Sequence, residues 1–210
     1  MNIYTDLQSK YSETSVILLD EIYKLFDYLK ADNVRQQLCR LVKEGLLMRG
    51  GNGIYYMPKT AIVGGVLPID FEQAITKKFM QGESKQYGYY SGMTKLYKLN
   101  ICNQMPNIRE VVSNFESSRK RQINFCGQKV IVRKPFFEIT NKNKDVLEFL
   151  DVVRIAYKYA DTEKSKVTEK LIAEYANKIT ATDIIKYVDY YPASVAKIIL
   201  KEFAINENFA

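Results

Sequence analysis

The stretch VRQQLCRLVKEGLLMRGGNGIYYMPK, residues 34–59, joins an amphipathic helix to a glycine-tipped hairpin. Its apolar residues recur at helical spacing, at Val34, Leu38, Leu41 and Val42. Polar and basic residues fall on the opposite side of the same helix. Gly45 occupies a position typical of a left-handed helix C-cap. Segments 46–49 and 54–57 then predict two strands around Gly50-Gly51-Asn52-Gly53, whose glycines suit a tight turn.

The residues before this stretch predict three further elements. Residues 2–12 favour a helix, 15–18 a short strand, and 19–26 a second helix with acidic residues in its first turn. Asp32 is a candidate N-cap of the next helix. Helix, short strand, helix, turn, helix, hairpin is the order of a winged helix-turn-helix. We therefore expect such a domain over residues 1–60.

A winged helix-turn-helix would contact DNA through the polar face of its last helix and through its hairpin. Arginine and glutamine can make paired hydrogen bonds to guanine and adenine edges in the major groove. Phosphate contacts come from lysines, arginines and hairpin residues. Arg35, Gln36 and Arg40 are predicted to face the major groove, with Asn33 at the start of the helix. The predicted phosphate contacts are Lys43, Arg49, Asn52 and Lys59. Two alternatives to DNA binding remain for this segment. The polar helix face could simply be solvated, or the domain could be a protein-interaction module.

Composition restricts the chemistry open to the chain. The 210 residues contain no histidine, which excludes Ser-His and Cys-His nucleophiles and most zinc sites. Cys39, Cys102 and Cys126 are odd in number and far apart, so they indicate free thiols in a reducing compartment. We expect a protein that is not an enzyme, holds no cofactor or metal, and does not interact with membranes.

The net charge of +7 is concentrated in the middle of the chain. Residues 1–60 carry 8 Lys and Arg against 7 Asp and Glu, residues 61–140 carry 12 against 6, and residues 141–210 carry 11 against 11. An excess of positive charge favours polyanionic partners. No signal peptide and no apolar run of membrane-spanning length is evident, so we expect a cytoplasmic protein.

Beyond residue 60 the sequence predicts a linker and a second domain. Residues 61–70 contain Gly64, Gly65 and Pro68 and indicate the linker. Asp70 is a candidate cap for a helix over 71–80. The second domain, residues 71–210, is expected to hold a small antiparallel sheet over about 109–133 and helices over about 143–205. The predicted fold class is α+β. Thr182 and Ser194 are candidate caps in the tail.

Two charged clusters lie in the second domain. Arg119, Lys120 and Arg121 form a compact basic group, which suits either a solvated strand edge or a phosphate or partner contact. Asp145, Glu148 and Asp151 are spaced three apart and share one helical face, so Mg²⁺ binding is conceivable. Solvated acids on a helix are far commoner than metal sites.

The stretch at 34–59 resembles the winged-helix segment of the AbiEi-like antitoxins. The matching residues are Val34-Arg35, Leu38, Arg40-Leu41, Lys43-Glu44-Gly45 and Gly53-Ile54-Tyr55-Tyr56. The segments YGYYSGMTKLYKLNICNQMP, residues 87–106, and SSRKRQINFCGQKVIVRKP, residues 117–135, are also similar to that family. The sequence departs from the pattern at 49–53, where the family is often more basic.

The resemblance implies a repressor with two functions. Its N-terminal winged helix would bind double-stranded operator DNA and repress its own operon. Its C-terminal domain would antagonise a nucleotidyltransferase-like toxin without requiring a stable complex. The alternative is a winged-helix transcriptional regulator whose C-terminal domain dimerises or senses a ligand.

Overall fold

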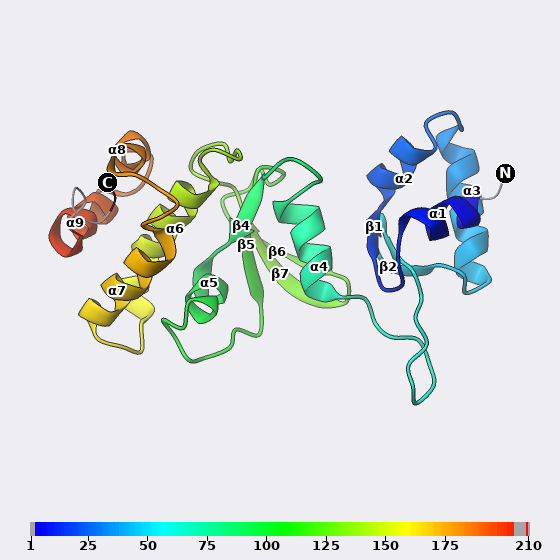
Figure 1. Cartoon of the computed structure of the whole chain (residues 1–210), viewed down its shortest axis with the longest axis horizontal. Helices are drawn as coiled ribbons and strands as arrows, with labels where there is room; N and C mark the ends of the chain where they lie inside the picture. The colour runs from blue at the N-terminus through cyan, green and yellow to red at the C-terminus, as the bar shows by residue number, and fades with distance from the viewer. Residues whose placement is uncertain (1–2, 204–208, 210) are drawn as a thin grey trace. The chain divides into compact units, whose positions relative to one another are not determined.

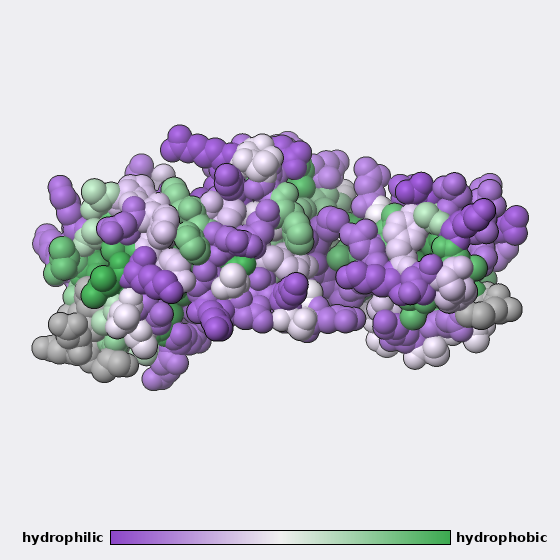
Figure 2. All heavy atoms as spheres, turned by 90° about the horizontal axis from the view of Figure 1, so that it is seen from above, coloured by the Kyte–Doolittle hydropathy of each residue, from purple (hydrophilic) through white to green (hydrophobic). Residues whose placement is uncertain are grey.

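The computed structural model describes residues 3–203 and 209 of a mixed α+β chain with small antiparallel sheets and C-terminal helices (Figure 1). Its contacts divide into two compact units. The first unit comprises residues 1–78 with 125–127, and the second comprises residues 79–124 with 128–210. In the described residues, no helix combines the length and apolar composition needed to cross a membrane. Hydrophilic side chains cover much of the surface seen in Figure 2.

The first unit contains helices and a three-stranded sheet. Its elements are α1 (Ile3–Lys10), β1 (Val16–Leu18), α2 (Leu19–Leu25), α3 (Ala31–Lys43), β2 (Met48–Gly51), β3 (Ile54–Tyr56) and α4 (Phe71–Ile75). A π-helical turn, Thr76–Met80, follows α4. The strand order is β1-β3-β2, with both pairs antiparallel. The three helices and short strands predicted before residue 60 are therefore present.

The hydrophobic core of the first unit explains why α3 forms where it does. Val34, Leu38 and Leu41 are buried, as the helical spacing predicted, and pack with Leu7, Ile22 and others. Burying such a stripe is what stabilises a helix of this length in water. Gly45 has φ of +71°, which confirms the predicted left-handed C-cap.

Two local details differ from the prediction. Asp32 is not the N-cap, because α3 begins at Ala31 after Lys30, and Lys30 makes no side-chain cap bond. The first hairpin strand is Met48–Gly51 instead of 46–49. The backbone N–H groups of Leu46 and Leu47 both donate to the Leu41 carbonyl, at 3.0 and 3.2 Å, so these two residues close the helix end before the strand begins.

Residues 61–70 form an exposed loop that leads to α4. The backbone N–H of Ala61 donates to the Gly65 carbonyl at 2.9 Å, and Ile62 and Val63 are fully exposed between them. The predicted Asp70 cap is confirmed, because its carboxylate accepts the Gln73 N–H at 3.0 Å. The contacts of the first unit continue through α4 to Lys78.

The second unit combines a sheet with five helices in the residues described. Its elements are β4 (Gly88–Tyr90), α5 (Gly92–Lys98), β5 (Arg109–Ser113), β6 (Arg121–Phe125), β7 (Gln128–Arg133), α6 (Lys144–Tyr159), α7 (Lys164–Tyr175), α8 (Ala181–Val188) and α9 (Ala193–Glu202). The strand order is β4-β5-β7-β6. Within the range 109–133, where an antiparallel sheet was expected, β5 and β7 pair in parallel. The antiparallel partner of β5 is β4, a strand that was not predicted.

Helix α6 is the centre of the second unit and contacts α5, α7, α8, α9 and β4. Leu147, Phe149, Leu150 and Val153 are buried along it. The tail is helical, as predicted, although residues 204–205 of the expected range lie outside the described residues.

The two predicted caps in the tail are wrong. Thr180 caps α8 in place of Thr182, because the Thr180 and Asp183 side chains satisfy each other's backbone N–H groups. Pro192 precedes α9, and Ser194 lies inside that helix.

Candidate functional site

Helix α3 presents an exposed polar face. Burial of Val34, Leu38 and Leu41 turns Asn33, Gln36, Arg40 and Lys43 outward, and all four are exposed. In the described part of the chain, the side chains of Gln36, Arg40 and Lys43 have no hydrogen bond or ion pair. Cys39 is exposed on the same helix, whereas Cys102 is buried and Cys126 is half-buried. The polar groups of this face are therefore available to a ligand.

Arg35 is the predicted major-groove residue that the structure holds in place. Its Nε donates to the hydroxyl of Tyr23 at 2.7 Å, and its guanidinium lies 5.9 Å from the centre of that ring. Asp32 lies 3.6 Å away, with both charged groups largely exposed. Because a guanidinium has five N–H donors, Arg35 keeps free donors while Tyr23 fixes its orientation.

The hairpin β2–β3 brings two predicted phosphate contacts together. Arg49 donates to the Gly51 carbonyl and to the Asn52 side-chain oxygen, both at 3.3 Å. Both side chains are exposed. The glycines of this hairpin were predicted to suit its tight turn, and Gly53 has φ of +68°. A Cβ at Gly50 would lie 2.5 Å from Cδ1 of Ile69, but this atom is the end of a flexible side chain that can move, so the contact does not by itself require glycine.

Lys59, the remaining predicted phosphate contact, follows β3 and is exposed. Its ammonium group lies 3.5 Å from the carboxylate of Glu13, which is also exposed. A surface pair of this kind contributes little to stability, because solvent screens it. The pair therefore leaves Lys59 able to exchange partners.

The three basic residues at 119–121 differ in their contacts. Arg121 pairs with Glu116, whose side chain is buried, through contacts of 2.8 and 3.0 Å. Burial disfavours the charge of Glu116, but the backbone N–H of Ser118 and the Arg121 guanidinium outweigh it and lower the pKa. Arg119 and Lys120 are exposed and line a cavity in the second unit. Arg121 thus has a structural contact, whereas Arg119 and Lys120 have no ion-pair partner among the described residues.

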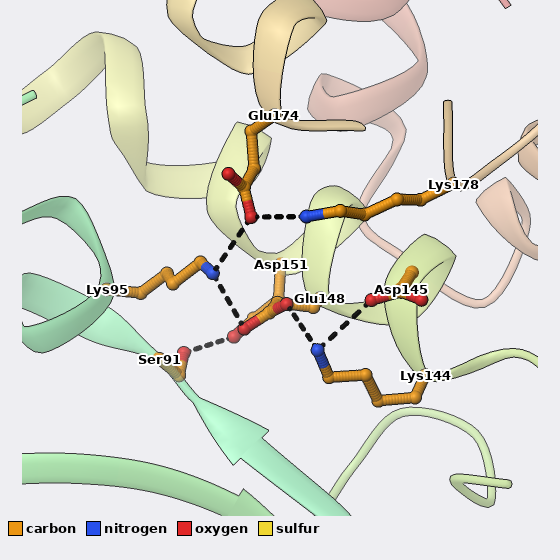
Figure 3. Close-up of polar contacts among 8 residues, drawn as sticks. All are labelled: Ser91, Lys95, Lys144, Asp145, Glu148, Asp151, Glu174 and Lys178. Carbon is orange, nitrogen blue, oxygen red and sulfur yellow. Dashed lines mark hydrogen bonds and ion pairs between the residues drawn. The ribbon is translucent and has the colours of Figure 1, made fainter. Parts of the chain in front are cut away.

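The carboxylates of α6 are held in ion pairs (Figure 3). Lys144 lies 3.1 Å from Asp145 and 3.0 Å from Glu148, and Lys95 approaches Glu148 from α5 at 3.1 Å. Burial disfavours the charge of Lys144, but Glu148 and Asp145 together raise its pKa. Glu174 accepts a contact from Lys95 and one from Lys178.

Asp151, the third carboxylate, lies in a separate buried network. It accepts a hydrogen bond from Ser91, pairs with Arg133 at 2.7 Å and pairs with Arg154 at 3.0 Å. Burial disfavours the charge of Arg133, but Asp151 and Glu110 outweigh it and raise its pKa. Among the described residues, no group of three or more Asp, Glu, Cys or His is arranged to hold a metal ion.

These features define an α+β protein with an exposed polar helix face in one unit and a basic cavity in the other. The chain matches, over residues 2–184, the model of a family described as a family of unknown function, DUF6088, and it belongs to that family. None of the curated proteins compared with the chain matches it.

Proposed function

We propose that the chain is a DNA-binding transcriptional repressor whose first unit is a winged helix-turn-helix. The element order α1, β1, α2, α3, β2, β3 and the antiparallel order β1-β3-β2 support this proposal. In a winged helix, the last helix enters the major groove and the hairpin contacts the backbone of the DNA. Helix α3 and the β2–β3 hairpin would take these two positions.

The observation that carries the proposal is the exposed, unpaired face of α3. On this face, Gln36, Arg40 and Lys43 have no hydrogen-bond or ion-pair partner among the described residues, so their donors are open to a nucleic acid. Arg40 would donate to a guanine edge, and Gln36 would pair with adenine. Asn33 and Arg35 would lie at the N-terminal end of this surface.

The remaining basic and polar residues would position the helix. Lys43, Arg49, Asn52 and Lys59 would neutralise or hydrogen-bond phosphates. The hydrogen bond from Arg49 to Asn52 places two of these groups at the hairpin tip. Such contacts contribute affinity and register without selecting a sequence.

The resemblance to AbiEi-like antitoxins supports a further part of the proposal. The repressor would act on its own operon in the cytoplasm, and its second unit would antagonise a nucleotidyltransferase-like toxin without requiring a stable complex. A second candidate, a regulator whose C-terminal unit senses a ligand, is favoured by one observation, the basic cavity lined by Arg119 and Lys120.

A gel-shift titration tests DNA binding directly. The full chain is titrated onto its own upstream DNA and onto scrambled DNA of equal length, at two salt concentrations. We expect tight binding to the upstream fragment alone. Arg40→Ala should weaken it, and Lys10→Ala, which removes an exposed cation from α1, should not. Weak, equal and salt-sensitive binding to both fragments would refute an operator there.

The antitoxin part needs a separate test in cells. The gene that neighbours this one is expressed alone and then together with the full chain. We expect the chain to relieve growth inhibition by a nucleotidyltransferase-like neighbour. Growth inhibition that the chain leaves unchanged would remove the antitoxin part and leave the repressor proposal intact.

A further inference from the structure

The second unit contains a cavity of about 1040 Å³ lined by basic and aromatic side chains. Its walls come from the segment between β5 and β6, from the residues that follow β7, and from α6. We propose that this cavity is a binding site for a nucleoside phosphate. The inference does not rest on DNA binding, because every lining residue belongs to the second unit.

The cavity has an excess of positive charge. Its cations are Arg119, Lys120, Arg133, Lys134 and Arg154, and among the described lining residues Glu110 is the one acid. Glu110 and Asp151 are already paired with Arg133. Arg119, Lys120 and Lys134 are exposed and, among the described residues, have no carboxylate partner. A phosphate group would supply the missing negative charge.

Backbone contacts hold the free cations side by side. The N–H of Lys134 donates to the Ser118 carbonyl at 3.0 Å, which joins the segment after β7 to the segment before β6. Buried Glu116 accepts the Ser118 N–H at 2.8 Å and pairs with Arg121. Arg119 and Lys120 lie between these two anchors. A loop fixed in this way loses little entropy when an anion binds.

Arg154 is also fixed in a geometry that suits an anion. Its Nε and Nη2 contact one oxygen of Asp151 at 3.1 and 3.0 Å, and Asp151 is buried. The other N–H donors of the guanidinium have no hydrogen-bond partner among the described residues and belong to a side chain that lines the cavity. Arg133 and Asp151 thus orient Arg154 and leave part of its donor set for a ligand.

The aromatic lining indicates that the ligand has a planar group as well as a phosphate. Phe136 and Tyr159 line the cavity with 44% and 46% of their surfaces exposed. The Phe136 ring lies 4.7 Å from that of Tyr191, which holds it in place. An exposed aromatic ring can stack on any nucleobase, because every base has a flat π-face. Half-buried Met93 and Ile155 extend this apolar wall.

Phosphate and base together match the cavity better than either part alone. Inorganic phosphate would leave the aromatic wall unused, and an uncharged aromatic ligand would leave the cations unused. The cavity volume of about 1040 Å³ lies just above the range for small-molecule sites, roughly 300–1,000 Å³, so a mononucleotide can be accommodated. A mononucleotide therefore fits its size and its chemistry.

Isothermal titration calorimetry of the full chain tests the proposal without DNA. The probes are the 5′-monophosphates and 5′-triphosphates of the four ribonucleosides, the four free nucleosides, and inorganic phosphate. We expect at least one nucleotide to bind with one-to-one stoichiometry. Its nucleoside and inorganic phosphate should each bind at least roughly tenfold more weakly, a difference of about 1.4 kcal/mol.

Matched variants locate the binding. Arg119→Ala combined with Lys120→Ala should weaken nucleotide binding at least roughly tenfold, and Tyr159→Ser should weaken it while leaving phosphate binding unchanged. The control combines Lys129→Ala with Lys142→Ala, which removes two exposed cations outside the cavity. It should bind as the parent does. Thermal unfolding verifies that each variant is folded.

Four results would overturn the inference. One is the absence of binding by every nucleotide at millimolar concentration. Another is equal binding of inorganic phosphate and nucleotides, which would define a simple phosphate site. A third is binding of a single-stranded oligonucleotide when no mononucleotide binds. The last is an equal loss in the control double variant, which would indicate non-specific charge attraction.

Discussion

Helices α3 and α6 are both rich in charge but use it in opposite ways. On α3, the basic residues Arg40 and Lys43 point outward and have no partner among the described residues. On α6, Glu148 and Asp151 are 4% and 1% exposed, and basic groups surround both. Charged side chains are therefore buried and paired on one helix, and exposed and open to a ligand on the other. Burial and pairing, more than residue type, separate structural charges from candidate binding residues.

The largest predicted effect comes from removing a buried charge on α6. Asp151→Ala leaves Arg133 and Arg154 without their shared partner, so we expect a loss of about 3–5 kcal/mol in the free energy of unfolding. Urea denaturation measures the loss. Asp189→Ala, at an exposed acid after α8, is the control and should change stability by less than about 0.5 kcal/mol. If Asp151→Ala changed the free energy of unfolding only slightly, the charges of α6 would not differ from those of α3 in their importance for stability.

A mutation on the α3 face should affect DNA binding and leave stability unchanged. Arg40→Ala removes an exposed side chain, so the unfolding curve should match that of the parent. Loss of a base contact should weaken operator binding by about 1–3 kcal/mol and relax specificity at one position. Competition gel shifts with single-base variants of the upstream fragment measure both quantities. Unchanged affinity and specificity would remove α3 as the recognition helix.

Lys43→Ala should also weaken DNA binding without changing stability, and by less than Arg40→Ala. A lost phosphate contact weakens binding equally on every sequence and lowers the slope of log affinity against log salt by about one unit. Affinities measured over a series of salt concentrations give this slope. If Lys43→Ala instead changes the sequence preference, Lys43 contacts a base edge and the assigned orientation of α3 needs revision.

The smallest predicted effect concerns the acid dependence of stability. The folded-state pKa of Glu116 lies below its ordinary value of 4.5. Its charge therefore stabilises the protein above that value, and the stabilisation is lost as pH falls through the folded-state pKa. Glu116→Gln should be less stable than the parent near neutral pH, and the difference should shrink below about pH 4.5.

Urea denaturation at a series of pH values tests the role of Glu116. Glu83→Gln, at an exposed acid with no partner among the described residues, serves as the reference. Its stability should follow that of the parent at every pH. A Glu116→Gln deficit that persists undiminished in acid would show that the amide disturbs the loop in some other way.

Local patterns in the sequence predicted much of the first unit. The stripe of Val34, Leu38 and Leu41 specified both the helix and its outward face, because helical periodicity and burial are linked. Gly45 marked a helix end through its positive φ, and Asp70 marked a helix start because its carboxylate accepts a backbone N–H. Asp32 did not mark the start of α3. Several neighbouring positions could begin this helix, and an acid is favourable in the first turn as well as at the N-cap.

Features that depend on distant partners were not predictable from these patterns. Strand β4 and the parallel pairing of β5 with β7 require residues that are far apart in sequence. The segment at 117–121 was recognised as basic, but its neighbours Lys134 and Arg154 come from two other elements. The acids of α6 share one face, as predicted. Only the fold shows that Lys95, Lys144 and Arg133 neutralise them.

The exposure of Cys39 has a practical consequence. It lies on the outward side of α3, between Gln36 and Arg40 along the helix, while Cys102 is buried and Cys126 is half-buried. A thiol-directed reagent should therefore label α3 first, with no engineered cysteine. If duplex DNA occupies this face, it will shield the thiol, and the alkylation rate will become a footprint of the bound state at a single atom.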